Sequence, residues 1–196
     1  MTPPSLRPKL SATPGVAARA LQFVILTATR TTETLGAQWD DEISFQTETW
    51  VIPKERIKMG EAFSVPLSEA ALRVLGDQMG ERGKSPYVFP GRPRAPLSGM
   101  AMSMLLRRMG ESVTVHGFRT SFRTWCSDIA HVEFEVAESC LSHRVGSAVS
   151  RAYARSDMLE RRRPIMSLWA NYVEGKADAN VVSISKGRAR APLRRA

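Results

Sequence analysis

The sequence predicts a mainly α-helical fold with one small antiparallel β-sheet, an α+β arrangement. Its 196 residues are 43% hydrophobic and 24% charged, which suits a single globular domain with a substantial core. Three short segments rich in Trp, Ile, Val and Phe follow one another within residues 38–68, as expected of neighbouring strands. Helical patterns occupy most of the remaining chain.

The two ends of the chain differ from its centre. Residues 1–15 contain four prolines and no periodic apolar pattern, so they predict an extended lead-in. Residues 174–196 hold six basic and two acidic side chains and predict a disordered basic tail, which either contacts DNA or only keeps that end solvated. The folded domain is therefore expected over residues 16–173.

The elements are expected in a definite order. Val16–Thr29 is apolar on nearly every side, which indicates a buried helix. Lys58 falls between the second and third predicted strands, at or near a hairpin turn, and Ser68 can cap the helix that follows the third strand. The last helix could pack on its own domain or on a neighbouring protomer, and Pro164 permits either if it lies in a first helical turn after a break. The strands are predicted at 38–46, 47–53 and 62–68, and the later helices at 68–79, 98–109, 116–130, 133–143, 146–155 and 157–173.

Composition excludes several classes of protein. The two cysteines, Cys126 and Cys140, form neither a CxxC pair nor a disulfide framework, which suits a reducing cytosol and makes a zinc site improbable. The longest apolar stretch, ALQFVILTA, is too short to span a bilayer, and the first residues lack a signal-peptide pattern. A cytoplasmic protein is expected. The net charge of +9 favours nucleic acid only weakly, because much of it lies in the tail.

Residues 116–130, HGFRTSFRTWCSDIA, combine an aromatic stripe with a polar face. At about 100° per residue, Phe118, Phe122 and Trp125 fall on one side of a helix, and His116 lies one turn from Arg119 on another. Such a pair is common on solvated faces and is weak evidence alone. The tyrosine in RAYAR, Tyr153, likewise has two interpretations: a packing residue that ties its hydroxyl to a neighbour, or a nucleophile.

Six polar residues and a glutamate occupy short motifs in a particular order. TATRTTE contains Arg30 and Glu33, IPKERIK followed by SVPLS contains Lys58, and HGFR contains His116 and Arg119. LSH contains His143, and Tyr153 follows ten residues later. In this order the motifs resemble the catalytic domain of the tyrosine recombinases, the lambda-integrase-like superfamily, and most closely integrases of P4-type prophages and genomic islands. The resemblance extends from about Val16 to Val173. Two letters depart from it, since Ala28 replaces a usual glycine and LSH replaces leucine-glycine-histidine.

The resemblance implies a fold, a reaction and partners. The fold would be the tyrosine recombinase catalytic domain. The substrate would be double-stranded DNA in the nucleoid, and the protein would act on it as a homotetramer whose protomers contact one another through the C-terminal helix. Tyr153 would form a 3′-phosphotyrosyl link while Lys58 protonates the leaving 5′-oxygen, without metal or ATP. Arg30 and Arg119 would hold phosphate oxygens, because a guanidinium keeps its charge and offers a planar fork. His116 and His143 would donate or shuttle protons in roles that the motifs do not separate, and Glu33 would orient Arg30 or a neighbour.

Other interpretations remain open. Tyr87 and Tyr172 are rival tyrosines that look like packing residues, and the contiguous carboxylates Asp40, Asp41 and Glu42 point apart, which argues against a metal-dependent integrase. Relatives usually carry a helical core-binding domain, which the 15 residues before Val16 are too few to form, so modest and salt-dependent DNA affinity is expected. A DNA-binding remnant that regulates or competes with a full recombinase is one alternative, and a nicking or relaxing enzyme like type IB topoisomerases is another.

Overall fold

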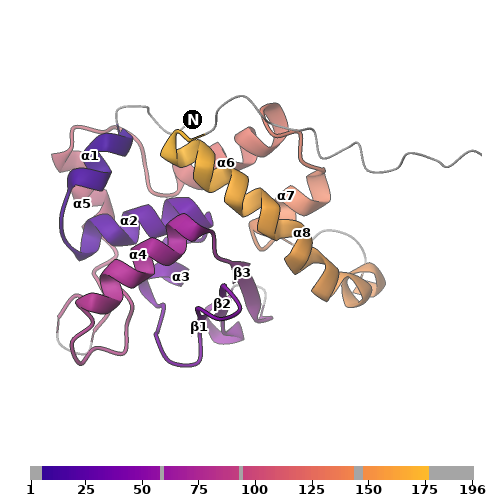
Figure 1. The fold of residues 1–196 in the computed structure, drawn as a ribbon, viewed down its shortest axis with the longest axis horizontal. Coiled ribbons are helices and arrows are strands. Elements are labelled where there is room, and N and C mark those ends of the chain that lie inside the picture. Colours follow the sequence, from indigo (N-terminus) through magenta and orange to yellow (C-terminus); the bar gives the residue numbers. More distant parts are fainter. Residues whose placement is uncertain (1–5, 58–59, 93–94, 144–147, 177–196) are drawn as a thin grey trace, which may run out of the picture.

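The computed structural model describes residues 6–57, 60–92, 95–143 and 148–176, without the side chains of residues 7, 8 and 148–157. Most of the described chain is helical, and one small three-stranded sheet lies at the lower centre of Figure 1, so the predicted α+β fold is confirmed. The helices are α1 (Leu6–Ala12), α2 (Val16–Thr27), α3 (Thr31–Leu35), the 3-10 turn η1 (Lys54–Arg56), α4 (Glu69–Gly80), α5 (Ala101–Arg108), α6 (Gly117–Asp128), α7 (Phe134–Cys140) and α8 (Ala148–Glu174). The strands are β1 (Ile43–Ser44), β2 (Thr49–Ile52) and β3 (Phe63–Pro66).

The sheet is antiparallel in the order β1-β2-β3 and packs against α2. Trp50 at the centre of β2 lies opposite Ile43 of β1 and Val65 of β3, and it is fully buried. Its ring lies 5.3 Å from the ring of Phe23, which projects from α2. The aromatic residues that predicted strands therefore also form the contact between sheet and helix.

The N-terminal segment differs from its expectation. An extended lead-in was predicted through residue 15, but Leu6–Ala12 form helix α1. Leu6 and Leu10 lie four residues apart on one face of this helix, and both are buried in the core. The prolines misled the prediction, because Pro8 falls in the first turn of the helix, where its missing N–H costs little.

Helix α2 forms the centre of the core, as its all-round apolar sequence predicts. Eight of its residues are buried, including Phe23 and Ile25. The carbonyl oxygen of Ile25 accepts a hydrogen bond of 2.8 Å from the indole Nε1–H of Trp169 in α8. The ring of Trp169 also packs against Phe122 and Trp125 of α6, at centroid distances of 5.3 Å in both cases. The predicted aromatic stripe of α6 is thus buried in an aromatic cluster.

The last two predicted helices are one. Residues Ala148–Glu174 form the continuous helix α8, which runs diagonally past the sheet and the other helices in Figure 1, with Pro164 in its interior. Pro164 therefore does not lie in a first helical turn after a break. Proline removes one helical hydrogen bond, but Ile165 and Trp169 beyond it are buried against the domain, and that packing outweighs the loss. No helix within the described part of the chain has the length and apolar character needed to cross a membrane.

Candidate active site

Arg30 stands at a sharp turn between α2 and α3. Helix α2 ends at Thr27, Ala28 adopts a left-handed conformation with φ of 51°, and Arg30 caps the start of α3. The buried carboxylate of Glu33 accepts two hydrogen bonds from Arg30, one from the backbone N–H at 2.7 Å and one from the guanidinium at 2.6 Å. One side chain therefore fixes both the backbone and the charged end of Arg30, which remains 27% exposed.

Arg119 reaches the same turn from α6. Its guanidinium donates to the carbonyl oxygen of Ala28, and its second terminal nitrogen donates to the carbonyl oxygen of Leu141 at 2.8 Å. The side chain is only 6% exposed. The sequence predicted Arg119 on a polar face beside His116, so its burial corrects that expectation. Arg119 thus links the turn after α2, 91 residues before it in sequence, to the turn after α7, 22 residues beyond it.

The two guanidiniums influence each other electrostatically. Burial, and then the positive charge of Arg30, lower the pKa of Arg119 to about 10, while the carboxylates of Glu33 and Glu138 act in the opposite direction. Arg119 nevertheless remains charged at neutral pH. A buried cation whose hydrogen bonds go to neutral carbonyls keeps uncompensated positive charge, which an anion beside it would neutralise.

His143 lies beside the guanidinium of Arg119. Helix α7 ends at Cys140, and the chain then turns so that the backbone N–H of His143 donates to the carbonyl of Glu138 at 3.1 Å. The Nε2 atom of the imidazole lies 3.5 Å from a terminal nitrogen of Arg119. The Nδ1 atom lies 2.7 Å from the carboxylate of Glu138. The side chain is 41% exposed, so its ring is open to solvent.

The structure does not bring all predicted site residues together. His116 caps the start of α6, and its carbonyl accepts the backbone N–H of Arg119, but no hydrogen bond joins its exposed imidazole to another described residue. Lys58 lies outside the described residues. Tyr153 lies in α8, and its side chain also lies outside them. Among the predicted residues, Arg30, Glu33, Arg119 and His143 form one connected group.

Sequence reasoning missed Glu138. Its carboxylate bridges His143 and Arg123, with 2.5 Å between Oε1 and the Nε of Arg123, although it is only 8% exposed. The available signal was a glutamate in α7, five residues before the histidine that ends the LSH motif. That spacing brings the two side chains together only because the helix stops at Cys140 and the chain folds back.

The rival residues have other structural explanations. Tyr172 packs its ring 5.7 Å from that of Trp169 in the aromatic cluster. The three successive carboxylates do not share a site, because Asp40 pairs with Arg82 at 3.0 Å while Glu42 accepts from Trp50 at 3.1 Å and from Arg56.

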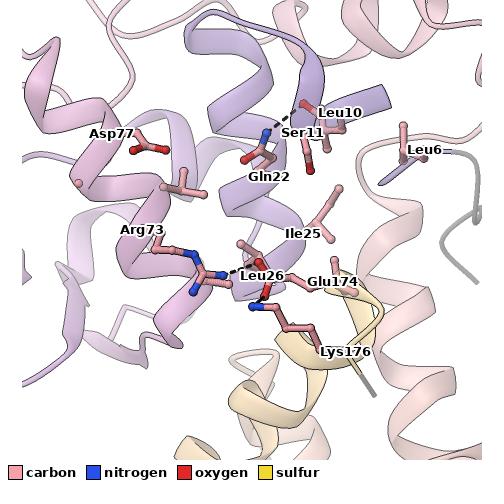
Figure 2. Close-up of a pocket in the computed structure, with 14 residues that line it drawn as sticks. Leu6, Leu10, Ser11, Gln22, Ile25, Leu26, Arg73, Asp77, Glu174 and Lys176 are labelled. Carbon is pink, nitrogen blue, oxygen red and sulfur yellow. Dashed lines mark hydrogen bonds and ion pairs between the residues drawn. The ribbon is translucent and has the colours of Figure 1, made fainter. Parts of the chain in front are cut away.

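A hollow of about 810 Å³ lies elsewhere, between α1, α2, α4 and the end of α8 (Figure 2). Its apolar wall includes Leu6 and Leu26, and its charged side chains neutralise one another. Glu174 pairs there with Arg73 at 2.5 Å and with Lys176 at 2.8 Å. None of the predicted site residues whose side chains the structure describes lines this hollow, so it is separate from the group around Arg119.

Comparison with known proteins gives related sequences over most of the chain. Residues 9–160 match the phage integrase family. Prophage integrase IntA of Escherichia coli (strain K12) is 36% identical over 162 residues, which cover 81% of this chain and 39% of IntA. The integrase of Enterobacteria phage P4 is 32% identical over 174 residues, which cover 79% of this chain and 39% of that protein. The chain therefore spans about two-fifths of the length of these relatives.

Solved structures show the same fold at low sequence identity. The Tn1549 transposon integrase in complex with circular intermediate DNA superimposes with a TM-score of 0.58 and 14% identity, over 80% of this chain and 64% of that one. A lambda integrase tetramer bound to a Holliday junction gives a TM-score of 0.52 and 17% identity, over 73% and 44% of the two chains. The fold is that of the tyrosine recombinase catalytic domain, and the chain belongs to the phage integrase family.

Proposed function

We propose that this chain is the catalytic domain of a site-specific recombinase that cuts and rejoins DNA strands through a 3′-phosphotyrosyl intermediate. The observation that carries the proposal is that Arg119 donates to the carbonyl oxygen of Ala28, two residues before Arg30, which brings two arginines 89 residues apart in sequence to one turn. A phosphodiester is the anion that this family's substrate would supply. Family membership supports the same assignment.

The arginines suit the charge that develops at phosphorus. Negative charge builds on the non-bridging oxygens as the nucleophile attacks, and prearranged donors stabilise it without reorganising. Arg119 is held by two backbone carbonyls and Arg30 by Glu33, so both guanidiniums are positioned before DNA arrives. Planar guanidiniums can each donate two hydrogen bonds to a phosphate.

The bond-making groups are assigned from the motifs. The phenolic oxygen of Tyr153 would attack phosphorus, form the phosphotyrosyl ester and release the 5′-oxygen, which would take a proton from Lys58. Rejoining is the reverse reaction, in which a 5′-hydroxyl attacks the ester and the proton returns. A phenol has an ordinary pKa of about 10, so neighbouring cations would have to favour its ionised form. No step consumes ATP, and independence of metal ions is part of the proposal.

The proposed partners are double-stranded DNA and, on DNA, other copies of the chain in a tetramer. Action on chromosomal DNA would place the protein in the cytoplasm with the nucleoid. The described part of α8 buries Ile165 and Trp169 in its own domain. Contacts between protomers would therefore have to use other surfaces of the C-terminal region than these two residues. The net charge of the chain, +9, would favour DNA binding that depends mainly on contacts to the phosphates.

The proposal is tested by trapping the covalent intermediate. Nicked duplexes with randomised sequence around the nick are incubated with the protein in EDTA, and denaturing gels separate any protein–DNA adduct. We expect an adduct with the parent chain and none with Tyr153→Phe, and mass spectrometry should find the phosphodiester on the peptide that contains Tyr153. Equal DNA binding by both forms without any adduct would instead indicate a silent DNA-binding remnant.

A further inference from the structure

A buried carboxylate connects the candidate site to a side chain outside the predicted set. Glu138 projects from α7 and accepts from the Nε of Arg123 at 2.5 Å through one oxygen. Its other oxygen lies 2.7 Å from the Nδ1 of His143. Both oxygens therefore have a nitrogen partner, and the carboxylate is held on two sides by groups from α6 and from the end of α7.

The bond to Glu138 determines which ring nitrogen of His143 carries hydrogen. An ionised carboxylate accepts hydrogen bonds and donates none, so Nδ1 must be protonated to face it. The Nε2 atom then points toward Arg119, at 3.5 Å, on the side where the two arginines converge. In the neutral ring Nε2 carries a lone pair, and in the charged ring it carries a proton that can be donated.

We propose that Glu138 is a positioning residue for the strand-transfer reaction, which holds His143 in the Nδ1–H form so that Nε2 is presented to the scissile phosphate. The proposal rests on the proposed function and extends it, because it identifies the ring atom that works and the residue that selects it. Arg123 has a supporting role, since it holds the second oxygen of Glu138 and keeps the carboxylate from rotating away.

The charges around the imidazole favour this arrangement. Burial opposes ionisation of Glu138, but hydrogen bonds from His143 and Arg123 and their positive charges outweigh it and keep the pKa of that carboxyl below its usual value. Arg119 and Arg123 face the group from α6, and the Arg161–Glu133 pair lies between α8 and the start of α7. The carboxylate is thus ionised at neutral pH and accepts hydrogen bonds from both partners.

Glu138→Gln is the informative variant. A glutamine oxygen can still accept from Nδ1–H, but its amide group can equally donate to an unprotonated Nδ1, so the ring is no longer restricted to one form. The chain has three histidines, which makes their imidazole ¹⁵N signals assignable. At a pH where an ordinary imidazole is neutral, we expect His143 of the parent protein to give one Nδ1–H form and the variant to give a mixture. Covalent cleavage should fall about ten- to a hundredfold, as for other residues that orient a working histidine.

Two controls separate positioning from general damage. Glu135→Gln makes the same change on an exposed position of the same helix and should alter neither the signals nor cleavage. Combining Glu138→Gln with His143→Ala should reduce cleavage no further than His143→Ala alone, because a residue that acts through His143 has no effect without it.

An unchanged ¹⁵N signature in Glu138→Gln, or additive losses in the double variant, would overturn the proposal. If even the parent protein forms no adduct, the proposed function fails while the ¹⁵N measurement still decides whether Glu138 selects the ring form.

Discussion

Trp169 donates its indole N–H to the carbonyl oxygen of Ile25 at 2.8 Å, which joins α8 to α2 across 144 residues of sequence. Five residues after Ile25 the chain reaches Arg30, and sixteen residues before Trp169 it carries Tyr153. The bond therefore ties the helix of the proposed nucleophile to the helix that positions the first arginine. Its buried position makes it important for stability as well as for alignment, because a buried carbonyl that loses its donor is costly.

Replacing Trp169 with Phe should lower the free energy of unfolding by about 2–3 kcal/mol, since it removes this donor and leaves a small cavity in the aromatic cluster. Trp39→Phe is the matched control. Trp39 is also buried, but within the described residues its Nε1 has no hydrogen-bond partner, so its replacement removes an unsatisfied donor and should cost less. Urea denaturation followed by circular dichroism measures both. Equal losses would show that the hydrogen bond to Ile25 contributes little.

Arg119→Lys should separate chemistry from binding. Lysine keeps a positive charge but cannot donate to the carbonyls of Ala28 and Leu141 while also presenting a fork to phosphate. We expect adduct formation to slow by about 100- to 1,000-fold, as when one prearranged donor is lost, with a much smaller change in DNA affinity. Single-turnover cleavage and fluorescence anisotropy measure the two quantities. Arg108→Lys, exposed on α5, should leave the cleavage rate unchanged.

Ala28 is the position where the sequence departs from the usual glycine of the family motif, and its φ of 51° explains that preference. A left-handed conformation costs an L-residue about 1–2 kcal/mol, which glycine avoids. Glycine, however, loses about 0.5–1 kcal/mol through the flexibility of the unfolded chain and about 0.8 kcal/mol through the missing buried methyl. These effects nearly cancel, so Ala28→Gly should change the free energy of unfolding by less than about 1 kcal/mol.

The control for Ala28→Gly is Ala20→Gly, at a fully buried position inside α2, the helix that ends one residue before Ala28. There glycine relieves no strain, and we expect a loss of about 2 kcal/mol. The two variants are compared by their urea midpoints at constant slope. A loss at Ala28 as large as that at Ala20 would mean that the turn does not strain alanine, and the missing glycine would then have no energetic explanation.

The fold was predictable where its determinants are local. The strand around Trp50 and the helix capped by Ser68 follow from neighbouring residues, and the cap is present, with the Ser68 hydroxyl accepting the N–H of Ala71 at 3.3 Å. Helix α1 was not predictable, because Pro8 is a strong local signal that burial of the helix overrides. The continuity of α8 across residue 156 likewise did not follow from the local pattern.

The candidate site shows the same division. Motif order identified Arg30, Arg119 and His143 as members of one group, and the structure places them together. Motif order could not reveal that Arg119 is buried, since its partners Ala28 and Leu141 lie 91 and 22 residues away in sequence. Nor could it reveal Glu138, whose contacts depend on where α7 ends and on the approach of Arg123 from another helix.

Cys126 and Cys140 should be unreactive until the protein unfolds. Both thiols are buried, and burial raises the pKa of Cys140 to about 12 and that of Cys126 well above its ordinary value, to which the nearby Cys140 also contributes. The reactive thiolate is therefore almost absent at pH 8. Because the folded state keeps protons that the unfolded state releases above about pH 8.5, stability should decrease as the pH rises past that value. Labelling with iodoacetamide should modify neither cysteine in buffer and both in urea. In the Cys126→Ala variant, urea should allow labelling of one cysteine only. Rapid labelling of the folded protein at pH 8 would show that the α6–α7 contact opens far more often than its burial implies.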